Sequence, residues 1–331
     1  MRISVVVPVR NEQDSIRELL DSLLSQTQRP EEIIITDGGS TDATTEIIES
    51  YVKRGAPIRL VYAGPALPGR GRNLAAAIAS SEWLAFTDGG VRPAPDWIGA
   101  LARRAEQDPS VEVVYGAWRP ITDSFFKECA AIAYVPAPIE RDGVLIRPRF
   151  IASSLIRLDV WRGVGGFPEH LRSAEDILFM NKVEEAGFRT VYEPGALVDW
   201  NIQPTLWHTF KRFVTYSRNN IRAGLWRKWQ AAIFRRYALI GMVAVPAIFV
   251  GVKWLILPLL LWLALLVARA VRALRQNRHS YPAGIVRNTL RLLLIVPIIA
   301  TLDLAAFIGS INWLLADKLH LAGAQRNNDP Q

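Results

Sequence analysis

Acidic side chains in three short segments are the residues best suited to chemistry in this sequence. Asp37 and Asp88 each precede a pair of glycines, and Glu175 and Asp176 are adjacent. A carboxylate accepts hydrogen bonds from hydroxyl or imide groups, holds a hard divalent cation or removes a proton as a general base. Repulsion between adjacent carboxylates raises the pKa of one of them, which suits a base. The ordinary alternatives are turn formation by Asp-Gly and favourable acids at a helix N-terminus.

A glycine-rich basic segment lies between the first two acids and reads Pro68-Gly69-Arg70-Gly71-Arg72-Asn73. Flexible glycines with two guanidinium groups suit phosphate oxygens, because each guanidinium presents several donors in a fixed plane. We therefore expect a phosphate-binding loop here, followed by a helix over residues 73–80. A solvated basic loop is the alternative. A P-loop is excluded because the Gly-Lys-Ser/Thr ending is absent.

The first 90 residues alternate predicted strands with predicted helices. Apolar runs at residues 3–9, 32–36, 58–63 and 83–87 indicate buried parallel strands. This alternation predicts an α/β fold with a doubly wound, mostly parallel central sheet and helices on both faces. Ligands of such sheets bind beyond the carboxyl ends of the strands. Because Asp37 and Asp88 each follow a strand, we expect them at the same edge. Further along, residues 174–186 predict a helix that opens with Glu175 and Asp176.

Long apolar runs dominate the last third of the 331-residue chain, which is 50% hydrophobic. Residues 237–268 exceed one membrane span of about 20 residues. We expect a hairpin of two helices turning near Lys253, with one tilted helix as the alternative. Residues 292–316 are a further candidate span, and the basic segment 269–291 should lie on the cytoplasmic side. Core helices of a soluble domain are rarely so long and so uniformly apolar.

Charge and cysteine content limit which partners and metal sites the chain is expected to have. The formal net charge is +8, and the basic residues lie beside apolar runs. That position favours anionic lipid headgroups, so we expect a membrane partner and no nucleic acid. The single cysteine, Cys129, allows no internal disulfide and argues against a cysteine-based zinc site. The first apolar run is short and broken by Pro8, unlike a signal peptide.

Four motifs in the first 90 residues, taken in order, resemble those of the family 2 glycosyltransferases. They are Pro8-Val9-Arg10-Asn11-Glu12, Asp37-Gly38-Gly39-Ser40-Thr41-Asp42, Pro68-Gly69-Arg70-Gly71-Arg72-Asn73 and Thr87-Asp88-Gly89-Gly90. A fifth, Ser173-Ala174-Glu175-Asp176, lies further along, and the resemblance extends to about residue 220. It implies a single Rossmann-like domain of the glycosyltransferase A type that binds a nucleotide-diphosphate sugar.

The resemblance also implies a role for each motif residue. Those expected to bind the nucleotide sugar are Pro8, Arg10, Glu12, Asp37, Gly39, Arg70, Arg72, Asn73 and Asp88. Asp88 matches the first acid of an Asp-x-Asp motif and implies a divalent cation, Mg²⁺ or Mn²⁺, on the donor diphosphate. Gly90 replaces the second acid, so Asp88 is the one metal ligand expected from the motif. Asp176 matches the general base, with Glu175 as its catalytic neighbour.

The expected reaction is transfer of one sugar, with inversion, to an acceptor hydroxyl or phosphate at the cytoplasmic face of the cell membrane. The Gln-x-x-Arg-Trp motif of processive members is missing, which argues for single-sugar transfer. We expect a lipid-linked or glycan acceptor near Tyr134, Arg141, Arg147 and Arg149. The expected parts are a donor-binding half (1–118), an acceptor-binding half with the base and a basic helix (119–230), two or three membrane spans (231–320) and a disordered tail (321–331).

Other functions remain possible on the sequence alone. A membrane protein that binds a nucleotide sugar without catalysis is the main alternative, and Gly90 in place of an acid favours it. A transport or scaffold component is disfavoured because the spans are few and carry few polar residues. A nicotinamide oxidoreductase is disfavoured because the first strand is not followed by Gly-x-Gly-x-x-Gly.

Overall fold

The chain forms two compact units in a computed structural model that describes residues 1–141 and 143–319. The first unit comprises residues 1–121 and 138–201, and the second comprises residues 122–137 and the chain from residue 202 onward. The predicted tail, residues 321–331, lies outside the described residues. The predicted division at residue 118 into donor and acceptor halves is functional and stays a prediction.

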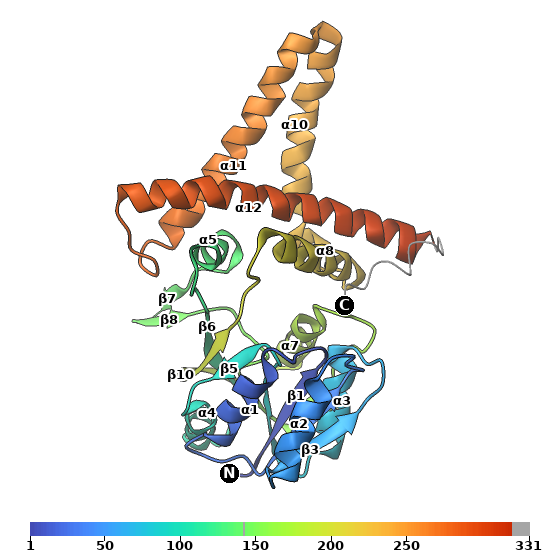
Figure 1. Ribbon diagram of the computed structural model, residues 1–331, viewed down its shortest axis with the longest axis vertical. Helices are drawn as coiled ribbons and strands as arrows, with labels where there is room; N and C mark the ends of the chain where they lie inside the picture. The colour runs from blue at the N-terminus through green and yellow to red at the C-terminus, as the bar shows by residue number, and fades with distance from the viewer. Residues whose placement is uncertain (142, 320–331) are drawn as a thin grey trace. The chain divides into compact units, whose positions relative to one another are not determined.

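Among the described residues, eight strands form one sheet in the first unit, in the order β3-β2-β1-β4-β9-β6-β10-β5 (Figure 1). The strands are β1 (Ile3–Val9), β2 (Glu32–Asp37), β3 (Ile58–Tyr62), β4 (Trp83–Phe86), β5 (Val91–Pro93), β6 (Val113–Pro120), β9 (Ser154–Arg157) and β10 (Thr190–Trp200). β1 runs parallel to β2 and β4, β2 to β3, and β6 to β10. The predicted α/β fold with a mostly parallel sheet is therefore confirmed. β7 (Ile139–Arg141) and β8 (Val144–Ile146) form a separate antiparallel ribbon.

Within the eight-stranded sheet, antiparallel pairing is confined to β9, which lies between β4 and β6, and to β5 at the edge. The alternation of strands and helices that predicts parallel pairing has ended by this point, because β7 and β8 precede β9 without an intervening helix. The pattern therefore carried no information on the direction of β9.

Helices cover both faces of the sheet, because the strand residues that point to either face are buried. On one face, Val6, Ile34 and Phe86 share a core with Val160 of α6 and Phe179 of α7. On the other face, α1 turns Ile16, Leu19, Leu20 and Leu23 inward, all fully buried, and α4 packs on β6 and β10. The helices are α1 (Ile16–Leu24), α2 (Thr44–Lys53), α3 (Pro68–Ile78), α4 (Trp97–Glu106), α6 (Leu158–Gly163) and α7 (Glu175–Glu185).

The glycine-rich segment is helical, so the prediction of a loop there was wrong. α3 begins at Pro68, and Gly69 to Asn73 form its first turns. Proline is favoured at the first position of a helix because its fixed φ and missing N–H cost nothing there. The two glycines are explained by packing rather than by loop flexibility, as the next subsection shows.

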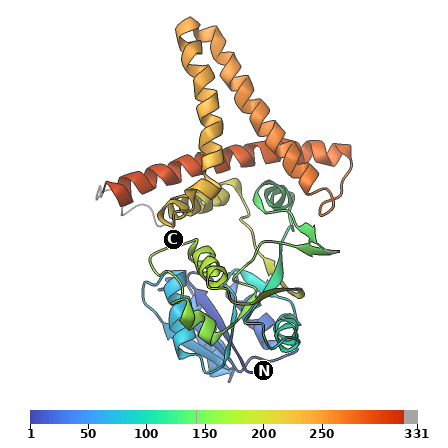
Figure 2. The ribbon, with the colours of Figure 1, turned by 180° about the vertical axis from the view of Figure 1, so that it is seen from behind.

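The second unit is helical. Its elements are α5 (Phe125–Tyr134), α8 (Leu206–Arg222), α9 (Trp226–Trp229), α10 (Ala231–Val250), η1 (Val252–Leu255), α11 (Ile256–Gln276), α12 (Ile285–Asn312) and η2 (Trp313–Lys318). α10 and α11 form the hairpin expected near Lys253, because the chain turns at Gly251, whose φ of 140° only glycine adopts readily (Figure 2). Among the described residues, three helical segments are long and apolar enough to cross a membrane, namely Ala231–Val250, Val252–Gln276 and Ile285–Lys318.

Candidate active site

The carboxyl ends of three adjacent parallel strands carry the first two acids. β1 lies between β2 and β4 and is parallel to both, with Val9 opposite Asp37 and Val6 opposite Phe86. Asp37 ends β2, and Asp88 follows the end of β4 by two residues. The expected placement at one edge of the sheet is therefore found, with β1 between the two acids.

The loops after β1 and β2 are tied together by hydrogen bonds. The Asn11 backbone N–H donates to Ser40 Oγ at 2.9 Å, and Thr41 N–H donates to Asn11 Oδ1 at 2.8 Å. The buried carboxylate of Asp37 accepts from the backbone N–H groups of Gly39 and Ser40, both at 3.1 Å. Asp37 therefore shapes its own turn, and Gly39 has the positive φ of 84° that this turn requires.

Arg72 of α3 joins the site on the sheet to α7. Its Nη2 donates to Asp88 Oδ1 at 2.7 Å, and its Nη1 donates to Glu175 Oε1 at 2.6 Å. The Arg72 side chain is only 4% exposed, and its guanidinium lies over the ring of Phe167. Segments more than 80 residues apart thus meet at a single guanidinium, which holds two carboxylates in fixed positions.

The two acids that open α7 have raised pKa values. Burial, with the nearby charge of Asp176, raises the pKa of Glu175 to about 7, against the opposing effect of Arg72. Loss of solvent also raises the pKa of Asp176; Arg72 opposes this rise, and the negative charge of Asp88 adds to it. Glu175 Oε2 is buried and has no hydrogen-bond partner among the described residues. A raised pKa increases the affinity of a carboxylate for a proton, which is what a general base needs.

Glycines in α3 permit close packing around Arg72. A Cβ on Gly69 would lie 2.2 Å from the carbonyl oxygen of Pro168, and one on Gly71 would lie 2.9 Å from Thr36 Oγ1 and 3.1 Å from Pro8 Cβ. α3 therefore packs against the end of β1 and against the segment before α7. Sequence reasoning assigned these glycines to phosphate binding and did not foresee this role, because the contacts are with residues distant in the chain.

A strained residue precedes the two acids. Ala174, at the N-cap of α7, has φ 72° and ψ −2°, a left-handed conformation that alanine rarely adopts. This conformation starts α7 immediately before Glu175. Strain of this kind persists where the surrounding structure holds it, and it is common at functional sites.

Residues 4–144 match the family model described as Glycosyl transferase family 2. The chain carries a family 2 glycosyltransferase domain. The resemblance seen in the motifs is confirmed.

Two curated bacterial proteins and one solved structure illustrate the similarity. The chain is 32% identical over 146 residues to the uncharacterized glycosyltransferase EpsJ of Bacillus subtilis, covering 44% of this chain and 40% of EpsJ. It is 31% identical over 202 residues to the poly(ribitol-phosphate) beta-glucosyltransferase of Bacillus spizizenii, covering 54% of this chain and 29% of that protein. The chain thus spans less than half the length of these relatives. The mannosyltransferase PcManGT of Pyrobaculum calidifontis, in complex with GDP-Man and Mn²⁺, has the same fold, with a TM-score of 0.54, 20% identity and coverage of 95% of this chain and 87% of that one.

Within the glycosyltransferase domain, Asn73 is occupied by protein contacts. Its amide nitrogen donates to the Phe167 carbonyl and to Glu169, both at 2.9 Å, and its oxygen accepts from Trp161 Nε1 and from the Phe167 N–H. These contacts use both donors and both acceptor positions of the amide. Asn73 thus ties α3 to the segment before α7, and its contact with a donor stays a prediction.

The other expected donor residues differ in their surroundings. Glu12 accepts a hydrogen bond from Ser15, and a Cβ on Gly89 would lie 2.7 Å from Glu12 Cγ, so Glu12 lies beside the Asp88 turn. Arg10 and Arg70 are exposed. Contact of these residues with a donor stays a prediction.

The residues expected near the acceptor are divided between the two units. Arg149 pairs with Glu184 at 2.8 Å, and Arg147 lies over the ring of Trp118 in the first unit. Tyr134 belongs to the second unit and packs against Phe213. The side chain of Arg141 lies outside the described residues. Their role toward an acceptor stays a prediction.

Asp88 is the residue that fits a divalent cation. No group of three or more histidine, cysteine or acidic side chains in the described part of the chain is arranged to hold a metal ion. The Asp88 side chain is 32% exposed, and Arg72 contacts its Oδ1. Mg²⁺ is often held by one or two carboxylates together with substrate phosphates and water. One accessible carboxylate therefore suits a cation shared with a bound diphosphate.

Proposed function

We propose that this chain is an inverting glycosyltransferase that moves one sugar from a nucleotide-diphosphate sugar to a lipid-linked acceptor at the cytoplasmic face of the membrane. The ion-paired cluster of Asp88, Arg72 and Glu175, with Asp176 beside it at the carboxyl edge of the parallel strands, is the observation that carries the proposal. Sheets of this type bind their ligands at this edge.

Asp176 is the proposed general base. It takes the proton of the acceptor hydroxyl as that oxygen forms a bond to the anomeric carbon. The bond from the anomeric carbon to the diphosphate oxygen breaks on the opposite side, so the configuration inverts and the nucleoside diphosphate leaves with the electron pair. The raised pKa of Asp176 increases its affinity for that proton.

Arg72 is a positioning residue in this proposal. It fixes the carboxylates of Asp88 and Glu175 and lowers the pKa of the Glu175–Asp176 pair by its charge. Asp88 would hold a divalent cation. When bound, this cation would neutralise negative charge on the leaving diphosphate. Positioning and charge compensation supply most of the rate in such displacements.

The membrane helices support a lipid-linked acceptor. α10 and α11 are largely apolar and have few buried residues, and Phe249, at the far end of α10, is 86% exposed. Such surface is stable in lipid and not in water. An enzyme held at the membrane has ready access to acceptors with a lipid anchor. The basic segment at the end of α11 supports the cytoplasmic orientation.

Transfer of labelled sugar to lipid tests the proposal. Membranes containing the wild-type chain are incubated with a panel of labelled nucleotide sugars and then extracted with organic solvent. We expect label in the lipid fraction, and a loss of at least about 100-fold in Asp176→Asn. The matched control is Glu18→Gln, an exposed acid in the first turn of α1, which should transfer at the wild-type rate.

A binding measurement beside the transfer assay tests the non-catalytic alternative, which Gly90 favours. Thermal stabilisation by nucleoside diphosphates measures donor binding independently of transfer. Stabilisation without transfer to any acceptor would support binding without catalysis. Label confined to a soluble product would contradict the lipid-linked acceptor but not the transferase, and undiminished transfer by Asp176→Asn would contradict the assignment of the base.

A further inference from the structure

α12 differs from α10 and α11 in its neighbours, although it has the highest mean hydropathy of the three, 2.4. α10 and α11 extend away from the rest of the second unit, whereas α12 runs across the direction of this hairpin (Figures 1 and 2). α12 packs along α8, α5 and α11. In the most apolar stretch of each helix, 39% of the residues of α12 are buried, against 6% in α10.

The helix packed along the second half of α12 is polar. α8 carries Lys211, Arg212, Arg218 and Arg222, and two of these side chains, Arg212 and Arg222, are exposed. Close contact between the two helices is clear at Gly309, where a Cβ would lie 2.5 Å from the carbonyl oxygen of Val214. Each lysine or arginine at the centre of a bilayer costs about 2.5–3.5 kcal/mol on insertion scales. α8 therefore belongs in water or at the interface, and the half of α12 that it covers must lie there too.

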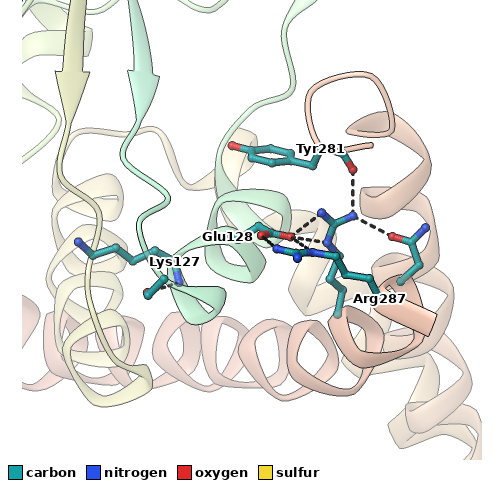
Figure 3. A network of polar contacts seen from close by, with 7 residues as sticks. Lys127, Glu128, Tyr281 and Arg287 are labelled. Carbon is teal, nitrogen blue, oxygen red and sulfur yellow. Dashed lines mark hydrogen bonds and ion pairs between the residues drawn. The ribbon is translucent and has the colours of Figure 1, made fainter. Parts of the chain in front are cut away.

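Ion pairs lie near the start, in the middle and beyond the end of α12. Near its start, Arg287 and Arg291 both donate to Glu128 of α5, and Arg291 Nη1 also donates to the Tyr281 carbonyl at 2.9 Å (Figure 3). In the middle, Asp303 accepts from Arg269 of α11 at 2.5 Å. Beyond its end, Asp317 pairs with Arg218 of α8 at 2.9 Å. In α10 and α11 the charged residues lie toward one end of each helix, whereas a spanning α12 would place Asp303 near the centre of the bilayer, where a charged side chain is costly.

The opposite face of α12 is an apolar stripe that runs the length of the helix. Its members are Val286, Leu290, Leu293, Leu304 and Ile311, which are 51–78% exposed. At about 100° per residue, all five fall within an arc of about 60°. The buried residues Arg291, Ile295 and Gly309 lie on the other side of the helix. That other side is covered by protein, mainly through apolar residues, so the stripe is the apolar surface of α12 that remains for lipid, as in helices that lie in a membrane interface.

The level of that interface is marked by α11. Its residues 256–268 are uncharged, and Arg269, Arg272 and Arg275 follow, so α11 leaves the hydrocarbon near Arg269. Arg269 pairs with Asp303, the residue near the middle of α12. The middle of α12 is therefore at the level where the hairpin meets the headgroups.

We propose that α12 lies flat in the membrane–water interface, with the apolar stripe in the outer acyl chains, and that only α10 and α11 cross the bilayer. The occupant of the stripe is the lipid surface itself, bound through apolar burial and through exposed arginines such as Arg272 and Arg275, which attract anionic headgroups. α12 then serves as a platform that holds α5 and α8 at the membrane surface. This inference does not depend on the reaction proposed above.

The depth of the stripe in the bilayer tests the proposal. Nitroxide labels are placed one at a time at Leu290, Leu293, Leu304 and Ile311 in a Cys129→Ser background, in liposomes of phosphatidylethanolamine and phosphatidylglycerol. Relative accessibility to oxygen and to a water-soluble nickel complex gives each depth. We expect all four labels at one shallow depth, about 5–10 Å below the phosphates. A steady change of about 30 Å between Leu290 and Ile311, the length of the intervening helix, would overturn the proposal. As an internal control, labels at Leu239 and Phe249 of α10 should differ by about 15 Å.

A second measurement needs no label within α12. Epitope tags are attached to both ends of the full chain, and sealed vesicles are treated with protease. Two spans place both tags on the same side, so both should be cleaved or both protected. Tags on opposite sides would show an odd number of spans and overturn the proposal.

Discussion

Nη1 of Arg72 lies 2.6 Å from Oε1 of Glu175, although 103 residues separate the two in the chain. The other terminal nitrogen of the same guanidinium contacts Asp88. One buried cation thus faces three carboxyls, counting Asp176, whose pKa Arg72 also lowers. The protonation state of the site therefore depends on Arg72.

Removing this cation should change the pH dependence of the reaction. In Arg72→Met the pKa of the Glu175–Asp176 pair should rise, because the positive charge that lowers it is gone. A neighbouring positive charge typically lowers the pKa of a carboxyl group by about 1–3 units. The acidic limb of the kcat/KM profile should move to higher pH by about that amount. Profiles between pH 5 and 9 measure the shift. Arg17→Met, an exposed change on α1, should leave the limb in place, and an unmoved limb in Arg72→Met would contradict the coupling.

Stability should depend on pH through Glu175. Its pKa in the folded state, about 7, is above the ordinary value of 4.5. The folded state therefore binds more protons between these values, and its stabilising contribution is complete below about pH 4.5 and lost as the pH rises through 7. Glu175→Gln removes this titration, so its free energy of unfolding should fall less between pH 5 and 8 than that of the wild type. Urea unfolding across this range is the measurement, and parallel curves would count against the raised pKa.

Metal binding should require both Asp88 and a diphosphate. One accessible carboxylate gives weak affinity by itself, and donor phosphates complete the coordination shell. Electron paramagnetic resonance of Mn²⁺ should therefore detect little binding to the protein alone and clear binding when a nucleoside diphosphate is added. Asp88→Asn should weaken the second affinity at least about tenfold, with Glu18→Gln unchanged. Tight binding of Mn²⁺ without a diphosphate would contradict a shared site.

The sequence predicted best what depends on local patterns. The strands that end near Asp37 and Asp88, and the helix that opens with Glu175, follow from apolar periodicity and turn residues. The hairpin at Gly251 follows from length and hydropathy. These features need only neighbouring residues, so a single sequence reveals them.

Long-range partners could not be predicted in the same way. Arg72 was expected to contact phosphate, and the structure pairs it with two carboxylates, one of them more than 100 residues away. Asn73 is held by residues 161–169, and Gly69 is required by Pro168. α12 has the composition of a span, yet its second half packs along the polar helix α8. In each case the deciding contact is with a distant segment, about which local composition carries no information.

The strain at Ala174 should be measurable as stability. A left-handed alanine costs about 1–2 kcal/mol, and glycine loses about 0.5–1 kcal/mol of that gain through its more flexible unfolded state. Ala174→Gly should therefore be as stable as the wild type or more stable by up to about 1.5 kcal/mol. Ala186→Gly, at the other end of α7 with an ordinary φ of −74°, should be less stable. Thermal unfolding compares the two, and equal losses in both would show that Ala174 is not strained.

Glu128 should be a main stabilising contact of the second unit. Its side chain accepts from Arg287 and Arg291 (Figure 3). The Arg291 side chain is only 4% exposed. Glu128→Ala leaves a buried guanidinium without its partner, which costs about 3 kcal/mol, the low end for a buried pair because Arg287 is 56% exposed. Thermal unfolding in detergent should show the loss.

The adjacent pair of Lys127 and Asp123 provides the control for Glu128, since the Asp123 side chain is 58% exposed. Asp123→Ala should cost less than about 1 kcal/mol, as is usual for an exposed pair one helical turn apart. The double variant Glu128→Met with Arg291→Met removes both buried charges and should recover part of the loss, because apolar side chains often replace a buried pair at little cost. Equal losses of stability in Glu128→Ala and Asp123→Ala would show that the buried pair with Arg291 does not stabilise the packing of α5 against α12.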